Sequence, residues 1–68
     1  MNFSFGDEIE VVIDREGLGT NEGIAHLPDE TMVVILGAGG KVGEAVRAMV
    51  VGKENTFVGS SLLATAMA

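Results

Sequence analysis

The residues most typical of a ligand-binding motif are the glycines in MVVILGAGGKVGEAVRAMVVG, residues 32–52. An apolar run, clustered glycines and helical spacing are typical of dinucleotide-binding βαβ units, where glycines let the backbone approach a pyrophosphate. Gly37 and Gly39 fit the first two positions of that motif, but the third falls on Val42. The acidic residue expected about 20 residues later to bind the ribose is replaced by Phe57. Dinucleotide binding is therefore kept only as a minor alternative, and a turn built from glycines is the favoured interpretation.

Other motifs for ligand binding or catalysis match the sequence less well. A calcium-binding loop would begin at Asp14, but the position of its closing carboxylate is Ala25. The only histidine, His26, lies in a predicted strand, and the chain has no cysteine and no serine placed beside it by sequence. We therefore expect no enzyme activity, no metal site and no cofactor, and we interpret His26 as an ordinary strand residue.

Length and charge limit the function further. A chain of 68 residues forms one small domain, which buries only about 60% of its unfolded surface. Ten acidic and four basic residues give a net charge of -6, which opposes non-specific attraction to phosphate backbones. No apolar stretch approaches the ~18 residues of a membrane span, and the N-terminus does not resemble a signal peptide. We expect a cytoplasmic protein without a membrane partner.

Hydrophobic patterning predicts mainly strands. Residues 8–14, EIEVVID, alternate between acidic and apolar side chains, as in a half-buried strand. Further strands are expected at residues 23–27, 31–36 and 57–66, with the polar turn GKENT before the last of them. Residues 42–51, VGEAVRAMVV, carry apolar side chains both at helical spacing and in alternation. Periodicity alone does not decide whether that segment is a helix or a strand.

Several short motifs occur together over most of the chain. In chain order they are Gly6, the pair Glu16 and Gly17, GIAHLPDETMVV (residues 23–34), VGEAV (residues 42–46) and TFVG (residues 56–59). The block GIAHLPDETMVV is the most specific of them. This set resembles a TRAM domain, most closely the version at the C-terminus of bacterial PIN-TRAM proteins.

The resemblance implies a fold and a function. It implies one TRAM-like domain over residues 1–68, with a core at about residues 6–64, folded as an all-β, five-stranded, OB-like antiparallel barrel. In that fold residues 42–51 form a strand. TRAM domains bind nucleic acid, chiefly RNA, so the chain is expected to bind RNA alone or as a module of a larger RNA-processing protein, for instance one with a PIN nuclease domain.

Such barrels bind single strands with basic residues along a groove and a stacking aromatic. The candidate nucleic-acid-binding residues are Arg15, Lys41, Arg47, Lys53 and Phe57. Three of them, Arg15, Lys41 and Lys53, fall in predicted turns, where they would converge at one end of the barrel. Phe57 is the stacking candidate, with a place in the core as its alternative.

Two features favour other partners. PIN-TRAM relatives often carry an arginine just after the glycine of the final strand, whereas this chain has Ser60. Together with the net charge of -6, this favours a protein-interaction or assembly module with the same fold and little RNA affinity. An incompletely closed barrel would also leave an edge for pairing with a second copy, so a homodimer is a further expected arrangement.

Overall fold

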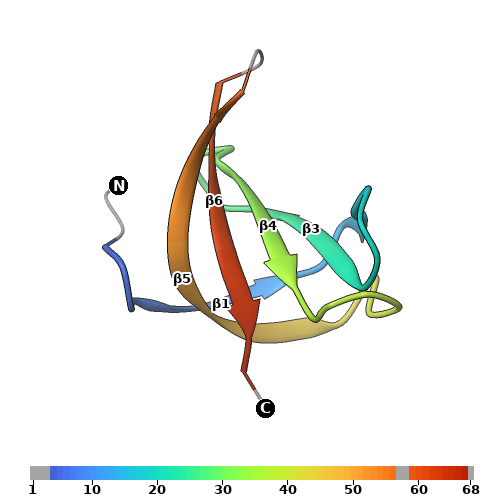
Figure 1. Cartoon of the computed structure of the whole chain (residues 1–68). Coiled ribbons are helices and arrows are strands. Elements are labelled where there is room, and N and C mark those ends of the chain that lie inside the picture. The colour runs from blue at the N-terminus through green and yellow to red at the C-terminus, as the bar shows by residue number, and fades with distance from the viewer. Residues whose placement is uncertain (1–3, 57–58, 68) are drawn as a thin grey trace.

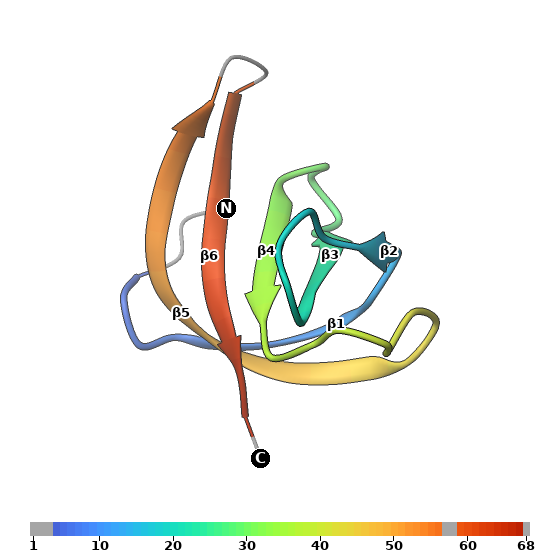
Figure 2. The ribbon, with the colours of Figure 1, turned by 45° about the vertical axis from the view of Figure 1, so that its right-hand side comes forward.

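The fold is all β, as the sequence predicts. A computed structural model describes residues 4–56 and 59–67, and these contain six strands and no helix. No helix among the described residues is therefore long and apolar enough to cross a membrane. The strands, labelled in Figure 1 except for β2, which Figure 2 labels, are β1 (Glu8–Val12), β2 (Arg15–Glu16), β3 (Glu22–His26), β4 (Met32–Leu36), β5 (Ala45–Thr56) and β6 (Gly59–Ala66).

All six strands form one mixed sheet with the order β1-β5-β6-β4-β3-β2. Neighbouring strands are antiparallel except for β4 and β6, which are parallel. β6 returns along β5 as a hairpin and then pairs with β4 on its other side (Figure 1). Because β5 reverses the chain between β4 and β6, these two strands must run in the same direction. The expectation of a purely antiparallel barrel of five strands is wrong in both strand direction and strand number.

The sixth strand arises from a bend in the N-terminal strand at Ile13 and Asp14. The N–H of Ile13 donates to the Glu44 carbonyl at 3.0 Å, and the Ile13 carbonyl accepts from the Gly43 N–H at 2.8 Å. The N–H of Asp14 donates instead to the Ile24 carbonyl of β3 at 2.7 Å. The chain thus leaves β5 and joins β3 within two residues. The sheet consequently curls into a half-barrel, which is consistent with a small β-barrel.

The glycine-rich segment 37–44 is a loop, which confirms the predicted turn. Gly37, Gly40 and Gly43 have φ angles of 86°, 75° and 87°, a region that glycine enters without steric cost. The following segment is a strand, not a helix, and begins at Ala45. It continues for 12 residues to Thr56, so the predicted turn GKENT belongs to β5.

Alternating aliphatic side chains fill the inside of the curled sheet. On β1 the apolar residues Ile9 and Val11 are buried, whereas Glu8 and Glu10 are exposed, as the alternation predicts. The core comprises Ile9, Val11, Ile13, Ala25, Leu27, Val33, Ile35, Ala38, Val46, Ala48, Val50, Leu62 and Ala64. These members come from β1, β3, β4, β5 and β6 and from the adjoining loops, so one aliphatic core holds the whole described chain together.

The loop 37–44 packs against the turn that precedes β3. The backbone N–H of Gly39 donates to Asn21 Oδ1 at 3.1 Å, and that of Gly37 donates to the Asn21 carbonyl at 2.8 Å. The Gly40 N–H donates to Glu16 Oε1 at 2.6 Å. A Cβ at position 39 would lie 2.6 Å from the Asn21 Cα atom. Close approach to backbone atoms, which cannot rotate away, therefore requires glycine at position 39.

We predict that Gly39→Ala destabilises the fold by about 1–3 kcal/mol, because the added methyl group overpacks a backbone contact. Gly52→Ala is the matched control, since a Cβ at position 52 would meet only the Leu63 Cβ at 3.9 Å. The free energy of unfolding from urea denaturation measures both variants. Equal stability of Gly39→Ala and Gly52→Ala would contradict the proposed role of Gly39.

Candidate functional site

A hollow on the described surface lies over β2, β3, β4 and the loop between β2 and β3. We call it the outer groove; it has a volume of about 530 Å³. Figure 2 shows the loop that follows β2 beside β3 and β4. The residues that line the groove are Arg15, Glu16, Gly17, Leu18, Glu22, Ile24, Met32 and Val34.

The floor of the outer groove is apolar. Ile24 on β3 faces Val34 on β4 in the strand register, and Met32 lies two residues before Val34 on the same side of β4. Ile24 is only 8% exposed, yet it is not part of the core cluster inside the sheet. Its side chain therefore contributes to a second apolar layer, on the outer face of the sheet. Because Val33 and Ile35 fill the inside, both faces of β4 are apolar.

One wall of the outer groove is the loop 17–21, which is folded around Glu22. The Gly17 N–H donates to the Glu22 carbonyl at 2.8 Å, and the Gly19 N–H donates to Glu22 Oε1 at 3.2 Å. A Cβ at Gly17 would lie 2.8 Å from the Glu22 Cβ. The intervening Leu18 is fully exposed. The glycines thus let the loop close on the carboxylate and hold an apolar side chain at the groove edge.

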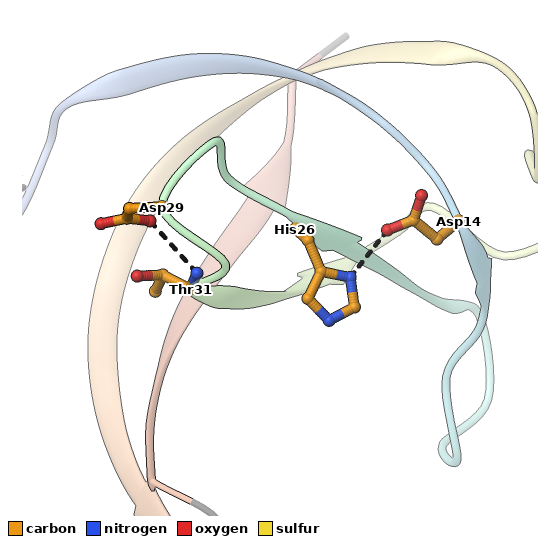
Figure 3. A network of polar contacts seen from close by, with 4 residues as sticks. All are labelled: Asp14, His26, Asp29 and Thr31. Carbon is orange, nitrogen blue, oxygen red and sulfur yellow. Dashed lines mark hydrogen bonds and ion pairs between the residues drawn. The ribbon is translucent and has the colours of Figure 1, made fainter.

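An aspartate and the histidine form a hydrogen bond next to the groove. His26 Nδ1 lies 2.8 Å from Asp14 Oδ2, and the two side chains are 38% and 49% exposed (Figure 3). His26 faces Met32, a groove residue, in the register of β3 and β4. Asp14 directly precedes Arg15, another groove residue. The pair therefore borders the groove at the end where Met32 lies.

Sequence reasoning missed this pair, because it treated His26 as an isolated strand residue. The two residues are separated by 12 positions and meet because Arg15 pairs with Ile24 in the β2–β3 register. The signal available in the sequence was an acidic residue at the end of one predicted strand and a histidine on the next. Among residues 4–56 and 59–67, no group of three or more acidic or histidine side chains is arranged to hold a metal ion.

The turn between β3 and β4 carries a second polar contact. The backbone N–H of Thr31 donates to Asp29 Oδ1 at 3.1 Å (Figure 3). Hydrogen bonds from the Thr31 hydroxyl and then from its backbone N–H lower the pKa of the Asp29 carboxyl below its usual range. Asp29 is fully exposed, so its charge faces solvent beside the His26 strand. This turn is an Asx-turn, which the sequence PDET favours.

The predicted basic residues do not converge on one end of the barrel. In the β1–β5 register Glu8 faces Met49 and Val12 faces Ala45. Residues before β1 therefore lie beside the later part of β5, where Lys53 is found, and residues after β1 lie beside loop 37–44. Arg15 lines the outer groove, and Lys41 follows Gly40, whose N–H binds the groove residue Glu16. The structure brings Arg15 and Lys41 to the same end and leaves Lys53 at the other.

The remaining candidates are dispersed. Arg47 on β5 forms an exposed ion pair with Glu8, with a distance of 3.9 Å between Nη1 and Oε1. Lys53 is in β5 and not in a turn; it lines a smaller hollow of about 230 Å³ with Phe5, Val50, Gly52 and Leu62. Phe57 lies outside the described residues. Of the predicted binding residues with described surroundings, only Arg15 lines the outer groove.

Comparison of the chain with protein-family models, with curated proteins and with solved structures finds no match.

We predict that Thr31→Val raises the pKa of Asp29 toward its usual range, because valine lacks the hydroxyl donor that contributes most to the lowered pKa. A pH titration of the Asp29 carboxyl by ¹³C NMR measures this. A lowered native pKa stabilises the fold above the unfolded pKa, and this contribution is lost as the pH falls through the native pKa. Thr31→Ser, which keeps a hydroxyl, should retain the low pKa; an unchanged pKa in Thr31→Val would contradict the assignment.

Proposed function

We propose that the chain is a small RNA-binding barrel that takes up single-stranded RNA in the outer groove. The observation that carries the proposal is the place of the groove in the fold. When β1 and β2 are counted as one bent strand, we infer from the strand order and the parallel β4–β6 pair that the sheet is related to an OB-like barrel. OB-like barrels bind oligonucleotides on the face of their second and third strands and beside the loop between the first and second. In this chain those elements are β3, β4 and loop 17–21, which bound the groove.

The chemistry of the groove supports the same ligand. Unstacked bases expose apolar faces, and the floor formed by Ile24, Met32 and Val34 offers an apolar surface of matching character. Arg15 provides one guanidinium at the groove for a phosphate. The resemblance of the GIAHLPDETMVV block to TRAM domains makes RNA the proposed nucleic acid. We propose that the domain acts alone or within a larger RNA-processing protein, for example beside a PIN nuclease domain.

Arg15→Ala should weaken binding of a single-stranded oligoribonucleotide and reduce the salt dependence of the affinity. Each phosphate contact contributes a slope of ~0.7 in a plot of log K against log salt for single strands. Lys53→Ala is the matched control, because it removes the same charge from the later part of β5, away from the outer groove. Fluorescence anisotropy at several salt concentrations measures both variants. Absence of binding by the wild type at low salt would refute the RNA proposal. Equal slopes for both variants would indicate that the RNA-binding site lies outside the groove.

A second candidate function is binding of another protein in the same groove. The observation that favours it is the character of the groove: three apolar side chains on the floor, two carboxylates from Glu16 and Glu22, and the fully exposed Leu18 at the edge. The net charge of the chain is -6. A partner segment with apolar and basic side chains would complement this surface, as expected for an assembly module.

For this second function, Leu18→Ser should weaken binding of a peptide of alternating leucine and lysine while leaving binding of RNA unchanged. The substitution removes apolar contact area and keeps the charge, so a purely electrostatic complex would not respond to it. NMR titration of both ligands against the wild type and the variant gives the comparison. If Leu18→Ser reduces RNA affinity and leaves peptide binding intact, the protein-binding alternative is rejected.

A further inference from the structure

The hydrogen bond between Asp14 and His26 fixes which nitrogen of the neutral imidazole carries the proton. An ionised carboxylate only accepts hydrogen bonds, so the contact of 2.8 Å requires Nδ1–H to donate to Asp14 Oδ2. In the neutral imidazole the other nitrogen, Nε2, then carries a lone pair and acts as an acceptor. This is the arrangement by which a carboxylate orients a histidine in many binding and catalytic sites.

The Nε2 atom is available for a ligand. Among the residues whose side chains the structure describes, none forms a hydrogen bond with it, and 38% of the His26 side chain is exposed. Figure 3 shows the ring held beside β3 with Nδ1 directed toward Asp14. The ring borders the outer groove, since His26 faces Met32 across the strands and lies two residues from Ile24.

The surroundings limit what Nε2 can bind. A phosphate oxygen is an acceptor and carries negative charge, so it pairs neither with a lone pair nor with the adjacent Asp14 carboxylate. A metal ion would need further ligands, and the described residues contain no group of three that could supply them. The complementary ligand is an uncharged hydrogen-bond donor.

We propose that His26 Nε2 accepts a hydrogen bond from a nucleotide donor at the Met32 end of the outer groove, and that Asp14 is the residue that positions it. The donor is either the ribose 2′-hydroxyl or an N–H group of an unpaired base, which share the required chemistry. This inference rests on the proposed function, because it names the part of the RNA that the groove recognises. It assigns a binding role to His26, which the sequence pattern indicated to be an ordinary strand residue.

The first test compares His26→Phe and Asp14→Asn with the wild-type protein on single-stranded RNA. Phenylalanine keeps an aromatic ring for stacking but removes the acceptor, and the asparagine amide no longer fixes the imidazole tautomer. Each variant should lose affinity by about two- to tenfold, the worth of one hydrogen bond. Asp29→Asn is the matched control, because it removes the same charge from the neighbouring turn. Loss of a negative charge favours RNA binding, so a lower affinity in Asp14→Asn alone cannot come from charge.

The second test identifies the donor. Affinities are measured for oligonucleotides of one sequence with ribose, deoxyribose or 2′-O-methylribose, and for oligouridine against oligoadenosine and oligocytidine. If the 2′-hydroxyl is the donor, His26→Phe removes the preference for ribose over deoxyribose. If a base N–H is the donor, the variant removes a preference between bases and leaves the ratio of ribose to deoxyribose unchanged. Either result supports the proposal and decides between the two sources.

The tautomer provides a readout without any ligand. Long-range ¹H–¹⁵N NMR of the imidazole should show a protonated Nδ1 and an unprotonated Nε2 in the wild type, and a change in Asp14→Asn. The opposite tautomer in the wild type would overturn the inference. Wild-type RNA binding that is equally strong in His26→Phe and Asp14→Asn would overturn the inference and leave the proposed function standing. A wild type that binds no oligonucleotide would overturn both.

Discussion

The bend at Ile13 and Asp14 is the constraint on which the rest of the structure depends. One segment pairs with β5 on one side of the bend and with β3 on the other, so the first and last positions of the strand order are covalently joined. Ile13 is 1% exposed and its side chain belongs to the core, while the Asp14 N–H binds β3. A chain this short has little apolar surface to bury. Curling the sheet through one bent strand lets both of its halves contribute to the same core.

The same bend creates the outer groove and its border. Because the backbone turns away from β5 at Asp14, Arg15 and Glu16 lie against β3 and form one side of the groove. The Asp14 side chain then reaches His26 on the neighbouring strand. Glu16 also accepts the Gly40 N–H at 2.6 Å, which ties this side to loop 37–44. The apolar floor, the polar pair and the glycine loop thus share one structural cause.

Much of the fold could be predicted from the sequence, and the reasons lie in particular residues. The alternation of Ile9 and Val11 with glutamates indicates a half-buried strand, and the glycines after Leu36 indicate a turn, because both signals are local. The bend is not visible, since Ile13 and Asp14 continue the same alternation. Lys53 was misplaced because GKENT has the composition of a turn, whereas pairing with β6 holds it in β5.

The candidate site was less predictable, because it depends on register. Asp14 and His26 meet only when Arg15 is opposite Ile24, and a single sequence does not fix that alignment. A partial signal was present in the strands themselves. The segments GIAHL and TMVVIL carry apolar residues on both faces, whereas a strand with one face in solvent needs them on only one face. That excess corresponds to Ile24, Met32 and Val34 on the groove floor.

The long-range pairing of the N-terminal strand also has a consequence for the order of folding. During synthesis β1 is made first, but its partner residues 45–49 are among the later ones to appear. The local hairpins β3–β4 and β5–β6 can form early, since short loops close quickly, whereas β1 must wait for a contact across most of the chain. Among the six described strands, the one that closes the sheet thus comes first in chain order and pairs across the longest stretch of sequence.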